Sequence, residues 1–233
     1  MRRLLLLSNS TNHGERYLAH AADEILRLLA GCRRVLFVPF ALHDRAAYTA
    51  KFRARLEELG KGVDQLAADA TGQRQIETAE AVFVGGGNTF RLLKTLQEAE
   101  LLAPLRARAL SGMPYLGASA GINLAGPTIR TTNDMPIVEP RGFDALGLVP
   151  FQINPHYLDP EPDSTHMGET REERIAEFHE ENATPVVGLR ERAWIRIEGA
   201  SGHLGGDRGA RLFRRGAPAE ELPPGAALDA LLA

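Results

Sequence analysis

Residues 113–124 read MPYLGASAGINL and contain the pattern G-x-S-x-G, with Ser119 at its centre. An apolar run precedes this serine, and a helix can begin directly after it, at residues 121–125. Strand, sharp turn and helix form the context of a nucleophile elbow, which lifts a serine hydroxyl clear of a sheet. Small flanking residues suit such a tight, strained turn. The stretch therefore predicts a nucleophilic serine, although the same five letters also suit an ordinary turn.

The chain before this stretch alternates short apolar runs with amphipathic segments. Strands are predicted at residues 4–7, 35–39, 63–66, 81–84 and 115–118, and helices at residues 16–29, 48–59, 74–79, 89–96 and 105–110. Short strands that are apolar on both faces and joined by helices are typical of a parallel sheet covered on both sides. We therefore predict an α/β protein with three layers, in which a mostly parallel sheet lies between helices.

The pattern changes after the elbow. Residues 128–160 are rich in Pro, Asn and Asp and predict loops with short strands. A helix is predicted within residues 164–182, capped by Thr165 or Thr170. Strands around a turn are predicted at residues 185–199 and a last strand at residues 210–216. The tail is predicted to close with a short helix. Without a repeat or a linker, residues 1–233 are predicted to form a single domain.

The composition and the motifs of the chain argue against several kinds of binding partner. The 233 residues carry a net charge of −3 with scattered arginines, so no nucleic-acid partner is expected. Cys32 is the only cysteine, which suits a reducing cytoplasm. The apolar run at residues 4–7 is too short for a secretion signal or a membrane span, and it is interpreted as a buried strand. No H-E-x-x-H pair is present, so neither a metal nor a cofactor is expected.

A glycine run, Gly85-Gly86-Gly87, follows one predicted strand and precedes a helix. Such a loop can expose backbone N–H groups to an anion. It matches neither G-x-G-x-x-G nor the Walker pattern. We therefore favour a second oxyanion donor beside Ser119 over a nucleotide-phosphate loop or a plain turn.

A nucleophilic serine needs a histidine base and a carboxylate that orients it. His156 follows an apolar strand and a proline, at the strand end where reactive groups gather in α/β sheets. Glu191 also follows a short apolar run, and its rivals are Asp134, Asp159 and Glu169. The other histidines are predicted at the surface (His13, His20, His43 and His179) or in polar loops of undefined role (His166 and His203).

Seven segments together resemble the peptidase E family of aspartyl dipeptidases: LLLLSNS, VGGGNTFRLLK, GASAGINLAGPTIRTTNDMPIV, FDALGL, QINPH, GETREERI and GLRERAW. The resemblance runs from residue 4 to residue 197. It implies a fold like that of the class I glutamine amidotransferases. It also implies hydrolysis of dipeptides that begin with aspartate, through an acyl-enzyme and without a metal.

The resemblance also implies roles for residues that match the family motifs. Ser119 matches the nucleophile, His156 the general base and Glu191 the residue that orients the histidine. The N–H groups of Gly87 and Ala120 are expected to hold the oxyanion. Asp134 matches a family position linked to activity, so its role competes with that of the glutamate.

An aspartyl substrate needs a cation for its β-carboxylate and a polar wall for its α-ammonium. Arg171 is the first candidate for the cation, although at the start of a helix it can instead pair with Glu172 or Glu173. Arg130 is the second candidate. Asp134 and Asn88 are the candidates for the wall.

Three other readings remain open. A cyanophycinase-like serine peptidase would also read aspartate, but on aspartate–arginine linkages that need an open groove. A non-catalytic binding protein on the same fold would not need all three catalytic side chains, and an esterase would need an apolar acyl pocket. In the favoured reading the partner is a small peptide, the enzyme is cytoplasmic and not bound to a membrane, and a homodimer is one option for its assembly.

Overall fold

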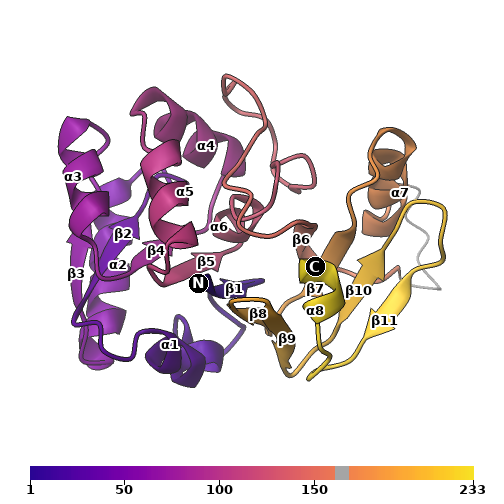
Figure 1. Cartoon of the computed structure of the whole chain (residues 1–233), viewed down its shortest axis with the longest axis horizontal. Helices are drawn as coiled ribbons and strands as arrows, with labels where there is room; N and C mark the ends of the chain where they lie inside the picture. The colour runs from indigo at the N-terminus through magenta and orange to yellow at the C-terminus, as the bar shows by residue number, and fades with distance from the viewer. Residues whose placement is uncertain (161–167) are drawn as a thin grey trace.

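The computed structural model describes residues 1–160 and 168–233 of the chain. Up to the elbow, strands and helices alternate (Figure 1): β1 (Arg3–Leu7), the short 3-10 helix η1 (Ala19–Ala21), α1 (Ala22–Leu28), β2 (Arg34–Val38), α2 (Arg45–Glu58), β3 (Gly62–Gln65), α3 (Ala70–Thr78), β4 (Val82–Val84), α4 (Thr89–Glu98), α5 (Leu102–Leu110), β5 (Tyr115–Ala118) and α6 (Ala120–Asn123). The later elements are β6 (Gln152–Tyr157), α7 (Arg171–Glu181), β7 (Val186–Arg190), β8 (Ala193–Glu198), β9 (Ser201–Gly206), β10 (Ala210–Phe213), β11 (Glu220–Leu222) and α8 (Asp229–Leu232).

The larger sheet has seven strands in the order β3-β2-β4-β5-β1-β8-β9. The first five of these strands are parallel to one another, whereas β8 and β9 are antiparallel additions at one side. The register pairs Leu7 with Ala118, so β1 and β5 end at the same edge of the sheet. That edge is where the elbow begins, because Ser119 directly follows β5.

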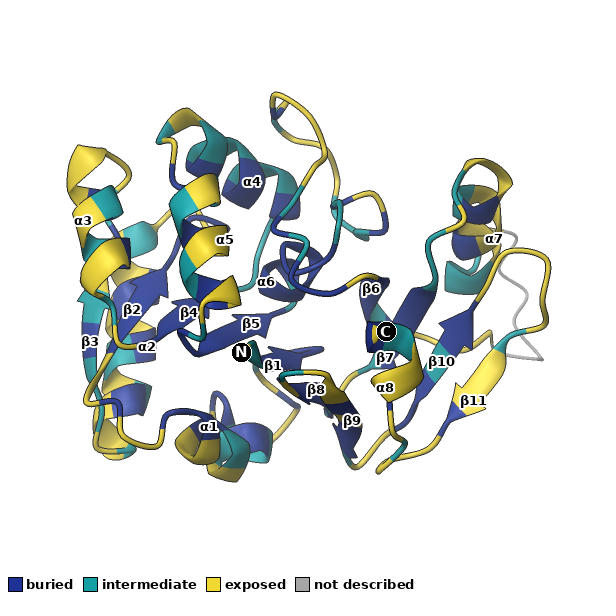
Figure 2. Ribbon diagram, viewed as in Figure 1, coloured by how far each residue is buried: buried dark blue, intermediate teal, exposed yellow. Residues whose placement is uncertain are grey.

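The sheet is apolar on both faces because helices cover both. Leu5 and Leu7 of β1 belong to a core cluster with residues of α1 and α2, whereas Leu4 and Leu6 belong to another cluster with residues of α4 and α5. Accordingly, β1, β2, β4 and β5 are dark blue in Figure 2. This alternation is the physical reason for the LLLL run, since a strand between two layers of helices has no solvent-facing side. The predicted three-layer α/β arrangement with a mostly parallel sheet is confirmed.

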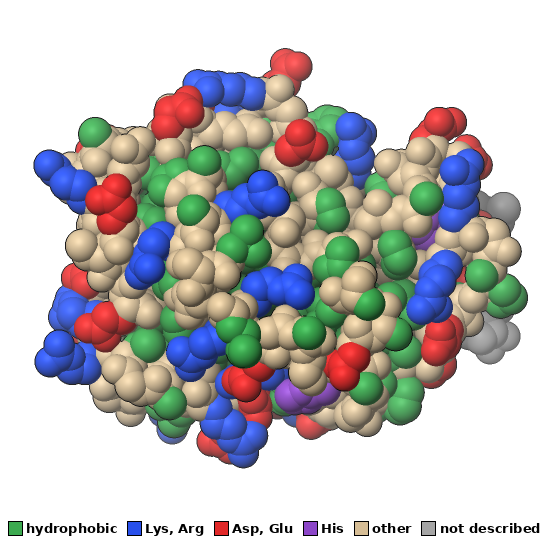
Figure 3. All heavy atoms as spheres, viewed as in Figure 1, with side chains coloured by type: hydrophobic (Ala, Val, Ile, Leu, Met, Phe, Trp, Pro, Cys, Tyr) green, Lys and Arg blue, Asp and Glu red, His purple; other side chains and the backbone are tan. Residues whose placement is uncertain are grey.

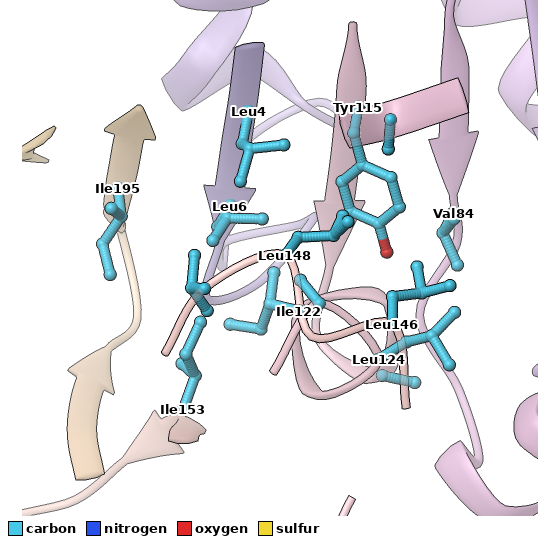
Figure 4. Packing of buried hydrophobic residues seen from close by; sticks show 14 of the residues in the cluster. Leu4, Leu6, Val84, Tyr115, Ile122, Leu124, Leu146, Leu148, Ile153 and Ile195 are labelled. Carbon is cyan, nitrogen blue, oxygen red and sulfur yellow. The ribbon is translucent and has the colours of Figure 1, made fainter. Parts of the chain in front are cut away.

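A second sheet has four strands in the order β11-β10-β7-β6 and carries α7 on one face. Its other face joins the larger core, because Ile153 of β6 and Leu189 of β7 belong to the same cluster as Ile195 of β8. Figure 4 shows this junction, with Ile195 beside Leu6 and Ile153 below them. The two sheets therefore share one hydrophobic core while presenting separate edges.

The local predictions after the elbow are only partly correct. The predicted strands on either side of a turn within residues 185–199 are confirmed as β7 and β8, although β7 joins the second sheet and β8 joins the first. The strand at residues 210–213 is not the last, since β11 follows it, and β9 was not predicted. The helix after the elbow begins at Ala120 and is only four residues long. The closing helix is confirmed as α8, and Thr170 caps α7 with a capping box, whereas Thr165 lies outside the described residues.

Candidate active site

Ser119 occupies a strained turn between β5 and α6. Its backbone has φ 51° and ψ −111°, a conformation that residues other than glycine rarely adopt. The following turn packs tightly against the neighbouring strand, because a Cβ at Gly121 would lie 2.2 Å from the carbonyl oxygen of Val84. Only glycine fits there, which explains the last glycine of the motif. The geometry is that of a nucleophile elbow.

His156 is brought to this serine from the second sheet. It lies within β6, not beyond the strand as the sequence suggested, at an irregularity where Pro155 pairs with Leu189 and Tyr157 with Arg190. Its backbone has φ 52°. The ring nitrogen Nε2 lies 2.9 Å from Oγ of Ser119, a hydrogen-bonding distance.

Glu191 binds the other side of the same ring. Its Oε1 lies 2.7 Å from Nδ1 of His156. The glutamate stands in the turn between β7 and β8, where the chain crosses from one sheet to the other. Both side chains are partly open to solvent, with 39% of the histidine and 52% of the glutamate exposed.

The turn that carries Glu191 is fixed through the next residue. Arg192, with φ 70°, donates its N–H to Oδ1 of Asn9 at 2.9 Å. Its guanidinium group binds Asp207 at 2.8 Å and also pairs with Glu15. Hydrogen bonds from Asn12 and Arg192 hold the pKa of the Glu15 carboxyl below its usual range. The turn is thus bound by residues of the N-terminal segment and by Asp207, the residue after β9.

The rival carboxylates are engaged elsewhere. Asp159 binds the guanidinium group of Arg190 at 2.7 Å, and Glu169 pairs with Arg174 at 3.3 Å. The Oδ2 atom of Asp134 accepts the backbone N–H of Thr89 at 2.8 Å. The structure therefore brings the glutamate, and none of these three, to the ring of His156.

Asp134 and Asn88 meet at the start of α4. Asp134 also accepts a hydrogen bond from the hydroxyl of Thr132 at 3.0 Å. Asn88 caps the helix by accepting the N–H of Arg91 at 3.0 Å, and it donates to the carbonyl oxygen of Met135 at 2.8 Å. The two residues thus tie the loop after Thr131 to the glycine loop, and Thr89 and Thr132 complete a polar cluster that the sequence did not reveal.

The glycine loop lies directly against the nucleophile. A Cβ at Gly86 would lie 3.0 Å from Cβ of Ser119. Among the described residues, no acceptor is found for the N–H of Gly87, the next residue. The N–H of Ala120 is the first of α6 and has no acceptor within that helix. Ala120 thus directly follows the serine, and Gly87 directly follows Gly86, the residue that lies against it.

The two candidate arginines have different surroundings. Arg171 is half-buried at the first position of α7, and burial, together with nearby Arg174, lowers the pKa of its guanidinium group. The two glutamates that follow it are engaged otherwise, Glu172 with Arg211 and Glu173 in the capping box. Arg130 is exposed, and its guanidinium carbon lies 4.9 Å from the ring centre of Phe143.

The other histidines do not all lie where the sequence predicted. His13 and His43 are exposed as expected, but His179 is buried and binds the carbonyl oxygen of Thr184. His203 lies in β9, not in a loop. His166 lies outside the described residues.

The surface and the helices add two findings. On the face that Figure 3 shows, basic and acidic side chains are interspersed over the part of the chain that is coloured. Within residues 1–160 and 168–233, no helix has the length and apolar character needed to cross a membrane.

The fold and the site together define a serine peptidase: an α/β sheet presents a serine on an elbow, and a histidine lies within hydrogen-bonding distance of its hydroxyl. More particularly, a model of peptidase family S51 matches residues 4–205, and the chain belongs to that family. The predicted resemblance is thereby confirmed.

Curated relatives align over almost the whole chain. Peptidase E of Streptomyces coelicolor is 56% identical over 229 residues, which cover 98% of this chain and 94% of the relative. The probable alpha-aspartyl dipeptidase of Drosophila melanogaster is 50% identical over 234 residues, covering 99% and 98%.

Two solved structures share the fold. A peptidase from an acI-B1 Actinobacterium superimposes with a TM-score of 0.72 at 17% identity, covering 97% of this chain and 96% of the other. A putative peptidase E protein from Listeria monocytogenes EGD-e gives a TM-score of 0.68 at 23% identity, covering 88% and 98%.

Proposed function

We propose that this protein hydrolyses dipeptides with N-terminal aspartate, with Ser119, His156 and Glu191 acting as a catalytic triad. One observation carries the proposal: the two ring nitrogens of His156 are bound on one side by the serine hydroxyl at 2.9 Å and on the other by the glutamate at 2.7 Å. A carboxylate on Nδ1 leaves Nε2 free to accept the proton of the serine and stabilises the imidazolium that results.

The reaction proceeds in two stages. Oγ of Ser119 attacks the carbonyl carbon of the aspartyl residue while its proton passes to Nε2 of His156. The resulting oxyanion rests on the N–H groups of Gly87 and Ala120. The C–N bond then breaks, the imidazolium gives its proton to the leaving amine, and an aspartyl ester of the serine remains. Water activated by the same histidine hydrolyses the ester and releases aspartate.

The names of two relatives and the positive charge of an arginine side chain support an N-terminal aspartate in the substrate. One curated relative is named a probable alpha-aspartyl dipeptidase, and another is named peptidase E. We assign the β-carboxylate of the substrate to Arg171, whose half-buried guanidinium group is suited to a charged partner. Arg130 is a weaker candidate because it stacks on Phe143 at the surface.

The α-ammonium group of the substrate is assigned to the cluster at the start of α4. Asp134 supplies a negative charge there, and Asn88 holds the loop beside it. A wall that binds a free ammonium group leaves no room for a preceding residue. This arrangement favours dipeptides over internal cleavage of longer chains.

The decisive experiment combines one variant with a substrate panel. Ser119→Ala should lower turnover at least about a thousandfold while the protein keeps its fold, because alanine is small enough for the elbow. The panel compares Asp-X with Glu-X, Asn-X, X-Asp, Asp-X-X and an aspartate–arginine side-chain linkage, each with and without chelator. Near-native turnover by the alanine variant would exclude Ser119 as the nucleophile, and loss of activity with chelator that zinc restores would exclude the serine mechanism.

A further inference from the structure

Ser8 is a fully buried serine that directly follows β1, outside the proposed triad. Its hydroxyl oxygen accepts the backbone N–H of His156 at 2.9 Å. The same hydroxyl donates to the carbonyl oxygen of Leu189 at 2.8 Å. A single side chain from the larger sheet is therefore inserted between two adjacent strands of the second sheet.

The insertion occurs where the β6–β7 ladder is irregular. Pro155 pairs with Leu189 and Tyr157 with Arg190, so His156 is left over between them. Its φ of 52° lies in the left-handed region, which a residue with a side chain adopts only when its surroundings enforce it. The hydroxyl of Ser8 gives the displaced N–H an acceptor and gives Leu189 a donor. Without it, a partly buried donor and a buried acceptor would both need new partners.

The segment around Ser8 is also hydrogen-bonded through the backbone to Ser119 and to the start of β8, the strand that follows Glu191. The N–H of Ser119 donates to the carbonyl oxygen of Leu7 at 3.1 Å. The N–H of Ser8 donates to the carbonyl oxygen of Ala193 at 3.1 Å, two residues beyond Glu191. The elbow, the histidine strand and the strand after the glutamate turn are thus all hydrogen-bonded to the end of β1.

We infer that Ser8 is a positioning residue for the reaction: its hydroxyl holds the backbone of His156 in the left-handed conformation that aims the ring at both Ser119 and Glu191. The inference rests on the proposed function of His156 as the general base. Ser8 does not touch the reacting atoms. It acts through the direction of the Cα–Cβ bond of the histidine, which the backbone dihedral angles determine.

A purely structural role makes a different prediction. A buried hydroxyl whose only task is stability would, when removed, lower the melting temperature and leave the folded enzyme fully active. A positioning role lowers kcat in the folded enzyme, because a displacement of about 1 Å at a catalytic group can cost about a hundredfold in rate. KM should change little, since Ser8 is fully buried and its hydroxyl is already bound to His156 and Leu189.

The test uses the full chain with Ser8→Ala and a matched control. Thr49→Val removes another buried hydroxyl, which donates to the carbonyl oxygen of Arg45 at 2.8 Å within α2. We expect kcat of the Ser8 variant on an Asp-X dipeptide to fall about 10- to 100-fold with KM near that of the wild type. The Thr49 variant should keep its kcat whatever its melting temperature.

A second readout needs no turnover. The proton on Nδ1 of His156, hydrogen-bonded to Glu191, gives an NMR signal that can be assigned by its loss in His156→Ala. Ser8→Ala should shift or broaden this signal, whereas Thr49→Val should leave it in place. Ser8→Cys, whose thiol donates and accepts more weakly, should give a kcat between those of the wild type and the alanine variant. It also serves as the test if the alanine variant does not fold.

The outcomes separate the two proposals. Wild-type kcat and an unchanged Nδ1 signal in a folded Ser8 variant would overturn the positioning role. So would equal losses of kcat in the Ser8 and Thr49 variants. Retained activity in Ser119→Ala or His156→Ala would instead refute the proposed function, and the NMR signal would then decide alone whether Ser8 orients the histidine.

Discussion

Oε1 of Glu191 lies 2.7 Å from Nδ1 of His156, although the two residues are 35 positions apart in the sequence. Glu191 stands where the chain leaves the second sheet and enters the first. Asp134, the other carboxylate with a claim on this role, instead accepts the N–H of Thr89 at the start of α4. Because the two carboxylates bind different partners, their amide variants should affect catalysis in different ways.

Glu191→Gln should lower kcat by about a thousandfold or more for every substrate, with a smaller change in KM. The amide cannot stabilise the imidazolium and favours the wrong tautomer of His156. Steady-state kinetics on several Asp-X dipeptides would measure this. Glu169→Gln is the matched control, because Glu169 is an exposed carboxylate paired with Arg174, and it should remain fully active. Equal effects of the two variants would contradict the assignment.

Asp134→Asn should act on the substrate ammonium group. Turnover of free-amine dipeptides should fall more than turnover of an N-acylated aspartyl substrate, because the desolvated acid no longer repels the acylated form. A small fall in melting temperature, about 1–4 °C, should accompany the weaker contact with the N-terminus of α4. Asp44→Asn controls for this, since Asp44 accepts the N–H of Ala47 at the start of α2. Only the Asp134 variant should change substrate selectivity.

Arg171→Met should reduce turnover of Asp-X about ten- to a hundredfold more than turnover of Asn-X, because the variant leaves the substrate carboxylate without its charged donor. Arg174→Met, three residues along the same helix, should affect both substrates alike. The ratio of kcat/KM values for the two dipeptides provides the measurement. Parallel losses on Asp-X and Asn-X would show that Arg171 has a structural role.

Gly86→Ala should impair catalysis more than stability. The added methyl group would lie 3.0 Å from Cβ of Ser119 and 3.2 Å from the carbonyl oxygen of Ala118, which displaces the elbow or the loop. We expect a loss of at least about tenfold in kcat, as for a misplaced catalytic group. Gly142→Ala, where a Cβ meets no atom within 4 Å, should be neutral. An unimpaired Gly86 variant would show that the loop does not constrain the nucleophile.

His20 should contribute to acid sensitivity of the fold. Burial lowers the pKa of its imidazole, near Glu15, Arg192 and Asp207, and both ring nitrogens lack a hydrogen-bond partner among the described residues. The unfolded chain therefore binds the proton more readily than the native state. The contribution of His20 to the free energy of unfolding is therefore fully present above the pKa of the histidine in the unfolded chain, about 6.5. This contribution falls as the pH decreases toward the lower pKa of His20 in the native state.

Chemical denaturation between about pH 7.5 and pH 5 measures this contribution. The free energy of unfolding of His20→Gln should fall less over this interval than that of the wild type. His13→Gln, at an exposed histidine, should follow the wild type. Superimposable pH profiles of the wild type and the His20 variant would refute the contribution.

Local sequence patterns were sufficient for the parallel strands of the larger sheet and for the elbow. The LLLL run of β1 and the apolar runs of β2, β4 and β5 indicate strands buried on both faces, and the structure places them so. The G-x-S-x-G pattern predicts a strained turn, and Ser119 has the corresponding left-handed φ of 51°. These features depend on residues near one another in the chain, where periodicity and steric limits act directly.

The tertiary structure alone decided how the two halves of the chain meet. The sequence predicts strands before and after Glu191 but not the sheets that they join. The two strands enter different sheets, and this crossing brings the glutamate to His156. The hydroxyl of Ser8 lies 148 positions from His156 and 181 from Leu189, although it bonds to both. No local pattern encodes such contacts, because they follow from which apolar faces share a core, and that choice is made by the whole chain at once.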